Sequence, residues 1–248
     1  MAESPSHSHN RTSRTAITGG SLALFAFFVA FAGFLGLSQG MLKPETGFRL
    51  FLLGVALGLV SLAVSSIGMY QTRRAPGRKL ALSGVVISCL LLAPVAPHVF
   101  NAFSVPPIHD ITTDTDNPPD FVDILPLRAD APNPSDYGGV AVAAMQKSAY
   151  PDITPLMLDL PPPETFARAR KLVEARGWKL AGADPEQGRI EAVAQTRMMK
   201  FRDDVVIRIT PAPDGSRVDM RSVSRFGQSD IGVNARRIRE FLKDLASS

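Results

Sequence analysis

Three uninterrupted apolar stretches in the first hundred residues constrain the fold of this chain more than any other feature. They run from about Ala16 to Ser38, from about Leu50 to Tyr70 and from about Leu80 to Phe100, and none contains Asp, Glu, Lys or Arg. Each reaches the roughly 20 residues that a helix needs to cross a bilayer. A water-soluble helix of that length carries charge on its exposed face. The sequence therefore predicts a three-span transmembrane region over residues 16–100, without a cleaved signal peptide.

Basic residues beside the spans predict the orientation in the membrane. The tail of residues 1–15 and the loop between the second and third spans hold six basic residues, whereas the loop between the first and second spans holds two and an acid. The six are Arg11, Arg14, Arg73, Arg74, Arg78 and Lys79. Because Lys and Arg collect on the cytoplasmic side, we expect a multi-pass protein of the bacterial inner membrane. Its N-terminal tail is then cytoplasmic and residues 101–248 are periplasmic.

The charge balance also limits the partners. Residues 101–248 carry nearly equal numbers of basic and acidic side chains, so they lack the basic footprint of a nucleic-acid-binding domain. No ionisable side chain lies within a predicted span, which argues against a transporter. A stripe of small residues in the second span, Gly54, Gly58, Ser61 and Ser65, predicts close helix packing within the bundle and leaves a homo-oligomer open.

The soluble part begins with a strap, the Pro-rich and acidic residues 101–138, which we expect to lie extended over a more basic body. Residues 139–248 alternate short strand patterns with helix patterns near Pro163 and from about Asp230 to Ala246. They predict an α+β domain with two layers: a mostly antiparallel sheet and two main helices on one face. If Ile209 pairs with Val218 across the Asp214-Gly215 turn, Arg208 faces Asp219 on the outer surface.

The stretch from Ser222 to Leu242 carries the candidate site, where a strand passes through Gly227 into the last helix. A helix N-terminus attracts anions through its free N–H groups, and polar residues gather there: Ser222, Ser224, Arg225, Ser229, Asn234 and Arg237. One interpretation is an anion-binding pocket, with His109 and Asp114 of the strap possible contacts. The alternatives are that Ser229 or Asp230 merely caps the helix, or that these groups bond the strap and hold it in place.

Other chemistry has weaker support. His109, Asp110, Asp114, Asp116 and Asp120 offer oxygen and nitrogen ligands, but their spacing fits no established metal loop. A hydrolase would depend on His109, the only histidine after residue 100, and no G-x-S-x-G elbow accompanies it. We therefore predict no metal, no cofactor and no catalytic residues.

Several motifs, in this order, resemble one family: "PPIHDITTDTDNPPDF", "AYPDI", "DDVVIRITP" and "RSVSRFGQSDIGVNARRIREFL". They are similar to the domain of unknown function 1499 over roughly residues 105 to 245. The resemblance supports a domain boundary between the membrane region and the soluble part. It implies no enzymatic activity and no ligand.

These observations favour a non-enzymatic module of the cell envelope, anchored in the lipid bilayer, that binds an envelope protein, the cell wall or an anionic small molecule. The alternative is a membrane-tethered periplasmic hydrolase that uses His109, Asp114 and Arg225 around the strand-to-helix turn.

Overall fold

The structure is a computed structural model that describes residues 13–74 and 76–247. The chain divides into two compact units, Met1–Val99 and Phe100–Ser248. Each is described by itself below.

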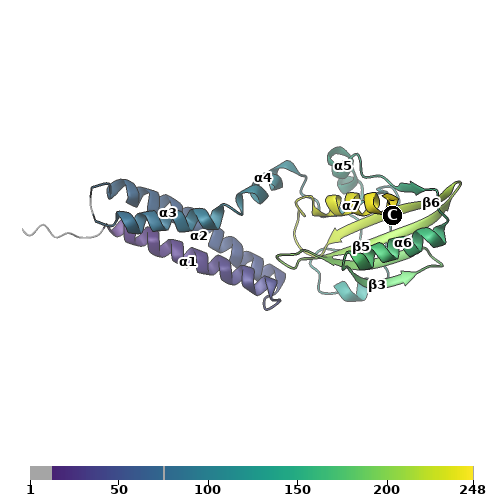
Figure 1. The fold of residues 1–248 in the computed structure, drawn as a ribbon, viewed down its shortest axis with the longest axis horizontal. Coiled ribbons are helices and arrows are strands. Elements are labelled where there is room, and N and C mark those ends of the chain that lie inside the picture. The colour runs from purple at the N-terminus through teal and green to yellow at the C-terminus, as the bar shows by residue number, and fades with distance from the viewer. Residues whose placement is uncertain (1–12, 75, 248) are drawn as a thin grey trace, which may run out of the picture. The chain divides into compact units, whose positions relative to one another are not determined.

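The first unit consists of apolar helices (Figure 1). They are α1 (Arg14–Ser38), α2 (Pro44–Gln71) and α3 (Arg78–Leu92), followed by α4 (Ala96–Ser104), which continues into the second unit. Helices α1 and α2 are each long and apolar enough to cross a membrane, and α3 and α4 meet that test together as one pair bent by 43°. Within the described residues there are thus two candidate spans, or three if the bent pair forms one span. The break falls at Pro94, as expected from the lost N–H of proline.

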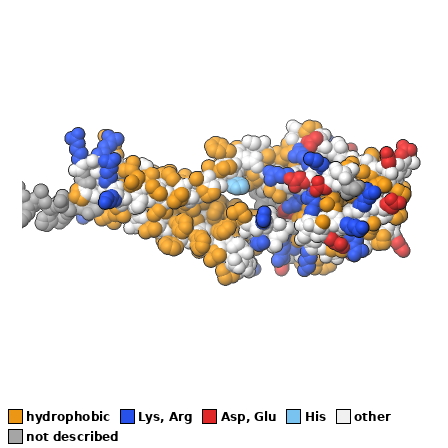
Figure 2. Space-filling model, in the orientation of Figure 1, with side chains coloured by type: hydrophobic (Ala, Val, Ile, Leu, Met, Phe, Trp, Pro, Cys, Tyr) orange, Lys and Arg blue, Asp and Glu red, His pale blue; other side chains and the backbone are white. Residues whose placement is uncertain are grey.

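Small residues let the helices of this unit approach closely. A Cβ added at Gly54 would lie 2.3 Å from the backbone nitrogen of Ala30, so α1 and α2 touch through their backbones there. The Ser61 Oγ donates to the Gly19 carbonyl at 3.0 Å and accepts from the Ser88 Oγ at 3.1 Å, which joins α1, α2 and α3. The predicted stripe of small residues in the second span is therefore buried within the bundle. Figure 2 shows hydrophobic side chains over the outside of these helices.

The second unit is built on an open, entirely antiparallel sheet. The strands run in the order β1-β6-β5-β4-β3, and β2 also pairs with β6. Their bounds are β1 (Asp110–Thr112), β2 (Leu156–Leu158), β3 (Lys179–Asp184), β4 (Arg189–Gln195), β5 (Arg202–Ala212) and β6 (Gly215–Ser224). Because β1 and β2 pair with different halves of β6, they share one edge of the sheet.

Two helices cover one face of this sheet, α6 (Pro162–Ala175) and α7 (Val233–Ser247) (Figure 1). Alternate residues of β4, β5 and β6 pack with Phe166, Val173, Ile238 and Phe241 in the main core. A further helix, α5 (Gly139–Ala149), leads from the strap into β2. The predicted α+β class is confirmed. So is the β5–β6 register, since Ile209 pairs with Val218 and Arg208 with Asp219.

The strap covers the other face of the sheet. Phe121 and Ile124 are buried against Val206 and Val223, and the 3-10 helix η1 (Leu125–Arg128) follows them. The strap is thus more structured than expected, because it contributes β1 and a small core of its own. For the same reason the Arg208–Asp219 pair does not lie on an open surface: Asp219 is 1% exposed. Contacts between residues distant in sequence specify this packing, among them the hydrogen bonds from the N–H groups of Val122 and Ile124 to the Glu191 carboxylate.

Candidate functional site

Four of the predicted site residues form one polar cluster where β6 meets α7. The Asn234 Oδ1 accepts from the Ser222 Oγ (2.7 Å) and from the Arg237 guanidinium. The Asn234 Nδ2 donates to the Ser224 Oγ (2.9 Å) and to the carbonyl of His109 (3.0 Å). An amide has two donor hydrogens and two acceptor lone pairs, so Asn234 is saturated. Its side chain therefore stabilises the junction of β6, α7 and the strap.

The protein's own carboxylates already occupy the positions where an anion would bind at this turn. The Arg237 Nη2 donates to Asp203 Oδ2 at 2.5 Å, and both side chains are more than nine-tenths buried. Asp230 accepts from the N–H groups of Gly232 (2.8 Å) and Asn234 (2.6 Å), which are donors at the start of α7. Burial raises the pKa of Asp230, although these two hydrogen bonds favour its charged form. An added anion would have to displace Asp203 or Asp230.

Arg225 points to the opposite side of the sheet. Its guanidinium makes two hydrogen bonds to the buried Asp204 Oδ1, at 2.7 and 2.9 Å, and one to the Leu127 carbonyl at 2.7 Å. Arg128 of the strap approaches the same carboxylate, with its Nε 3.2 Å from Asp204 Oδ2. Arg225 therefore holds the strap on the second face and does not join the Asn234 cluster.

The remaining three predicted residues are also separated. The Ser229 Oγ accepts from the Ile231 N–H at 3.2 Å, as a local turn contact. The His109 Nδ1 lies 3.3 Å from the Gln228 carbonyl, so its ring contacts the turn. Asp114 instead accepts from the Arg217 Nη2 at 2.8 Å. Arg217 and Arg225 are eight residues apart along β6, or about 26 Å in an extended strand. His109, Asp114 and Arg225 are thus not assembled around one point.

Several of these contacts match the third interpretation of the sequence, in which polar groups hold the strap. Asn234 and Arg225 both donate to strap carbonyls. The Asn133 Nδ2 of the strap also donates to the carbonyls of Ser224 (2.8 Å) and Gly227 (2.9 Å). A ligand at this turn stays a prediction.

Arg221, which is not among the predicted site residues, makes four hydrogen bonds to the strap. Its guanidinium binds both carboxylate oxygens of Asp110, at 2.7 and 3.0 Å, and donates to the carbonyls of Pro119 and Ser135. It also lies over the rings of Phe121 and Tyr137, with centroids at 4.9 and 5.5 Å. The alternation along β6 predicts that Arg221 lies on the face of the sheet opposite α6 and α7. Its partners in the strap cannot be predicted in this way, because they are about a hundred residues away in sequence.

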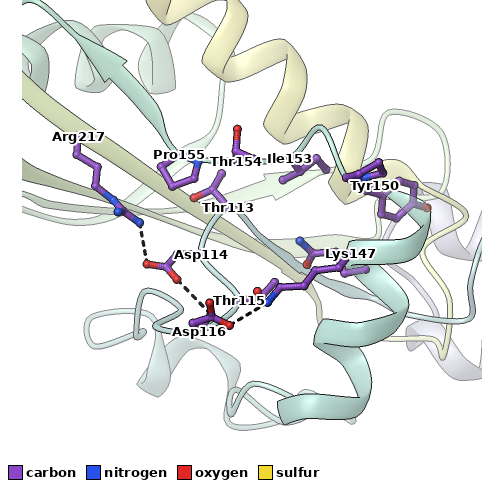
Figure 3. Close-up of a pocket in the computed structure, with 12 residues that line it drawn as sticks. Thr113, Asp114, Thr115, Asp116, Lys147, Tyr150, Ile153, Thr154, Pro155 and Arg217 are labelled. Carbon is purple, nitrogen blue, oxygen red and sulfur yellow. Dashed lines mark hydrogen bonds and ion pairs between the residues drawn. The ribbon is translucent and has the colours of Figure 1, made fainter.

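An open groove of about 490 Å³ lies where the strap leaves β1, beside α5 and the segment before β2 (Figure 3). Polar and charged side chains dominate its lining: Thr113, Asp114, Thr115, Asp116, Gln146, Lys147, Tyr150, Thr154 and Arg217. The Gln146 side chain bonds both the N–H (3.0 Å) and the carbonyl (2.6 Å) of Thr112, as a neighbouring strand would. That contact closes the outer edge of β1 and fixes one wall of the groove.

Two acidic side chains lie between two basic ones along the groove (Figure 3). Arg217 donates to Asp114, whose Oδ1 accepts from the backbone N–H of Asp116 at 3.1 Å, and the Lys147 Nζ donates to Asp116 Oδ1 at 3.0 Å. The side chains of Lys147 and Asp116 are 58% and 85% exposed. Their pair is weak in water, so each group can change partners when a charged ligand arrives.

The described parts of the chain, residues 13–74 and 76–247, contain no group of three or more His, Cys, Asp or Glu side chains placed to hold a metal ion. Two of the strap acids considered as metal ligands bind arginines instead: Asp110 binds Arg221 and Asp114 binds Arg217.

Comparison with known proteins agrees with the motifs in the sequence. A search of curated proteins gave no match. Residues 110–245, more than half of the chain and nearly all of its second unit, match the family model described as "Protein of unknown function (DUF1499)". The chain therefore belongs to the DUF1499 family.

Proposed function

We propose that this protein is a non-enzymatic binding module of the bacterial envelope, anchored in the inner membrane by its N-terminal helices with its C-terminal domain in the periplasm. The basic residues of the N-terminal tail and of the loop between α2 and α3 support this orientation. The apolar outer surface of α1 and α2 supports the anchoring.

The groove beside α5 carries the binding role. The buried Gln146 side chain fixes one wall of the groove. Lys147 and Asp116 are exposed and carry opposite charges, with the Lys147 Nζ 3.0 Å from Asp116 Oδ1. A ligand bearing both an ammonium and a carboxylate group complements this pair. Short peptide segments, including those of a cell wall or of a partner protein, have that chemistry.

The hydrolase alternative has less support, because His109, Asp114 and Arg225 lie apart and each has a structural contact. The anion site at the strand-to-helix turn remains a separate prediction. Phosphate that raises the unfolding temperature of the wild type but not of Arg237→Gln would support it, because Arg237 is the arginine that lies at this turn.

The binding proposal is tested by thermal unfolding of the full chain in detergent. Trp178 is the only tryptophan and stacks on Phe241 in the core of the second unit, with ring centroids 5.5 Å apart, so its fluorescence reports that unit alone. The probes are a Lys-Glu dipeptide, a lysine amide and an acetylated glutamate. At ten times its Kd a ligand adds about 1.4 kcal/mol of stability, which raises the Tm by about 3–6 °C.

We expect this shift with the dipeptide and its loss in Lys147→Glu. The matched control is Arg170→Glu, which changes an equally exposed basic residue paired with Glu174 on α6, outside the groove. No shift in the wild type, or a shift that survives in Lys147→Glu, would contradict the proposal.

A further inference from the structure

Helix α3 is too short to cross a bilayer alone. Its 15 residues span about 22 Å at 1.5 Å per residue, whereas the hydrocarbon core is about 30 Å thick. The 25 residues of α1 and the 28 of α2 exceed that thickness. A third crossing therefore needs about 8 Å more than α3 provides.

Helix α4 has the composition to supply the missing length. It begins four residues after the end of α3, and its nine residues, APHVFNAFS, include no Asp, Glu, Lys or Arg. None of its residues is buried, and the side chains of Phe100 and Phe103 are 75% and 88% exposed. Transfer of such rings out of water is favourable, so an apolar phase stabilises α4 more than water does.

We propose that the first half of α4 completes the third crossing and that Phe100 and Phe103 insert into the lipid at the outer membrane interface. The occupant of this aromatic surface is thus lipid, at the boundary between headgroups and acyl chains. Residues 93–95 supply about 4.5 Å at the helical rise, and two or three residues at the start of α4 supply the rest. The chain therefore leaves the hydrocarbon before Phe100, and Phe100 and Phe103 lie at the depth where interfacial helices bury their apolar faces.

Contacts within the second unit hold the end of α4 and the chain after it. The Asn101 Nδ2 of α4 donates to the Ile231 carbonyl at 3.1 Å, and the Asp230 N–H donates to the Ile108 carbonyl at 3.2 Å. Both contacts leave the side chains of Phe100 and Phe103 exposed.

Tryptophan placed at Phe103 tests this inference in the full chain. In a Trp178→Phe background the only tryptophan is then the one introduced by Phe103→Trp. The matched control is Val140→Trp on α5, because Val140 and Phe103 are both 88% exposed. Each variant is placed in phosphatidylcholine nanodiscs, with or without lipids brominated near the top of the acyl chains, and is also titrated with aqueous iodide. If Trp178→Phe does not fold, Trp178 is kept and the wild-type signal is subtracted.

We expect brominated lipid to remove most of the Phe103→Trp emission and iodide to leave it largely unchanged, with the reverse for Val140→Trp. Emission at Phe103→Trp that iodide quenches and brominated lipid does not would place α4 in water. Emission that neither agent quenches would mean that a second copy or another part of the protein covers the helix. Both results overturn the inference.

Discussion

Replacing Arg221 with methionine should destabilise the second unit more than any surface substitution of arginine. Methionine keeps an unbranched apolar stem like that of arginine but removes the guanidinium. Arg221 is 1% exposed and Asp110 is 4% exposed, so the variant leaves a buried carboxylate without its cation. It also leaves the carbonyls of Pro119 and Ser135 without this donor.

The expected loss in the free energy of unfolding follows from the burial of this ion pair. Removing one partner of a buried ion pair costs about 3–5 kcal/mol, because the remaining charge loses its compensation. Domains of this kind have a free energy of unfolding of about 5–15 kcal/mol. We therefore expect Arg221→Met to lose at least about a fifth of the stability and to free the strap from the sheet. Arg221→Lys should recover only part of the loss, since an ammonium cannot bind both oxygens of Asp110 in the same geometry.

The assay is urea denaturation of the full chain in detergent, followed by Trp178 fluorescence. The control is Arg239→Met. Arg239 also binds both oxygens of an aspartate, Asp152, at 2.5 and 2.7 Å, and lies over a tyrosine ring. Its side chain is 42% exposed, however, so its loss should cost about 0.2–1 kcal/mol. Equal losses in the two variants, or a loss below about 1 kcal/mol for Arg221→Met, would refute the reasoning from burial.

Three further predictions concern other parts of the molecule. Burial, reinforced by Asp110, raises the pKa of Tyr137 to about 12, so between about pH 10 and 12 the folded state holds a proton that the unfolded state has lost. Stability should fall as the pH rises through that range in wild-type unfolding curves, and this part of the fall should be absent in Tyr137→Phe. Asn234→Ala leaves several buried partners unsatisfied and should cost about 2–4 kcal/mol by urea denaturation; a cost below about 0.5 kcal/mol would contradict the saturated cluster. Gly54→Ile should clash with the backbone of Ala30 and lower the temperature at which helical circular dichroism is lost, while the Trp178 transition stays unchanged; a shift of both transitions together would contradict the division into two units.

Patterns local in sequence predict the secondary structure of this protein well. The alternation in β5 and the Asp214-Gly215 turn fix the register with β6, and the apolar faces of α6 and α7 specify which sides are buried. The expected extended strap contains β1, which has only three residues. A strand that short has too little periodicity to detect, and its pairing with β6 joins residues more than a hundred positions apart.

The candidate site was harder to predict, because its residues lie on two faces of the sheet. Those on one face bond α7, and Arg225 on the other face bonds the strap. The β6 alternation correctly places Ser222 and Ser224 toward α7, with Asn234 between them. Arg225, next in the chain, points to the other face, where the strap provides its partner. No pattern in the sequence identifies Asp203 as the acid that binds Arg237, since that contact depends on how β5 lies beside β6.

The central claim, a domain held outside the cytoplasm by a membrane anchor, is tested most directly by cysteine labelling. Cys89 is the only cysteine, so a Cys89→Ser background accepts single cysteines at Val140, in the C-terminal domain, and at Arg73, in the loop after α2. Spheroplasts of a Gram-negative host are treated with a maleimide that cannot cross membranes. The account predicts that Val140→Cys is labelled in intact spheroplasts and that Arg73→Cys is labelled only after lysis. The opposite pattern, or release of the protein from membranes by alkaline carbonate, would contradict it.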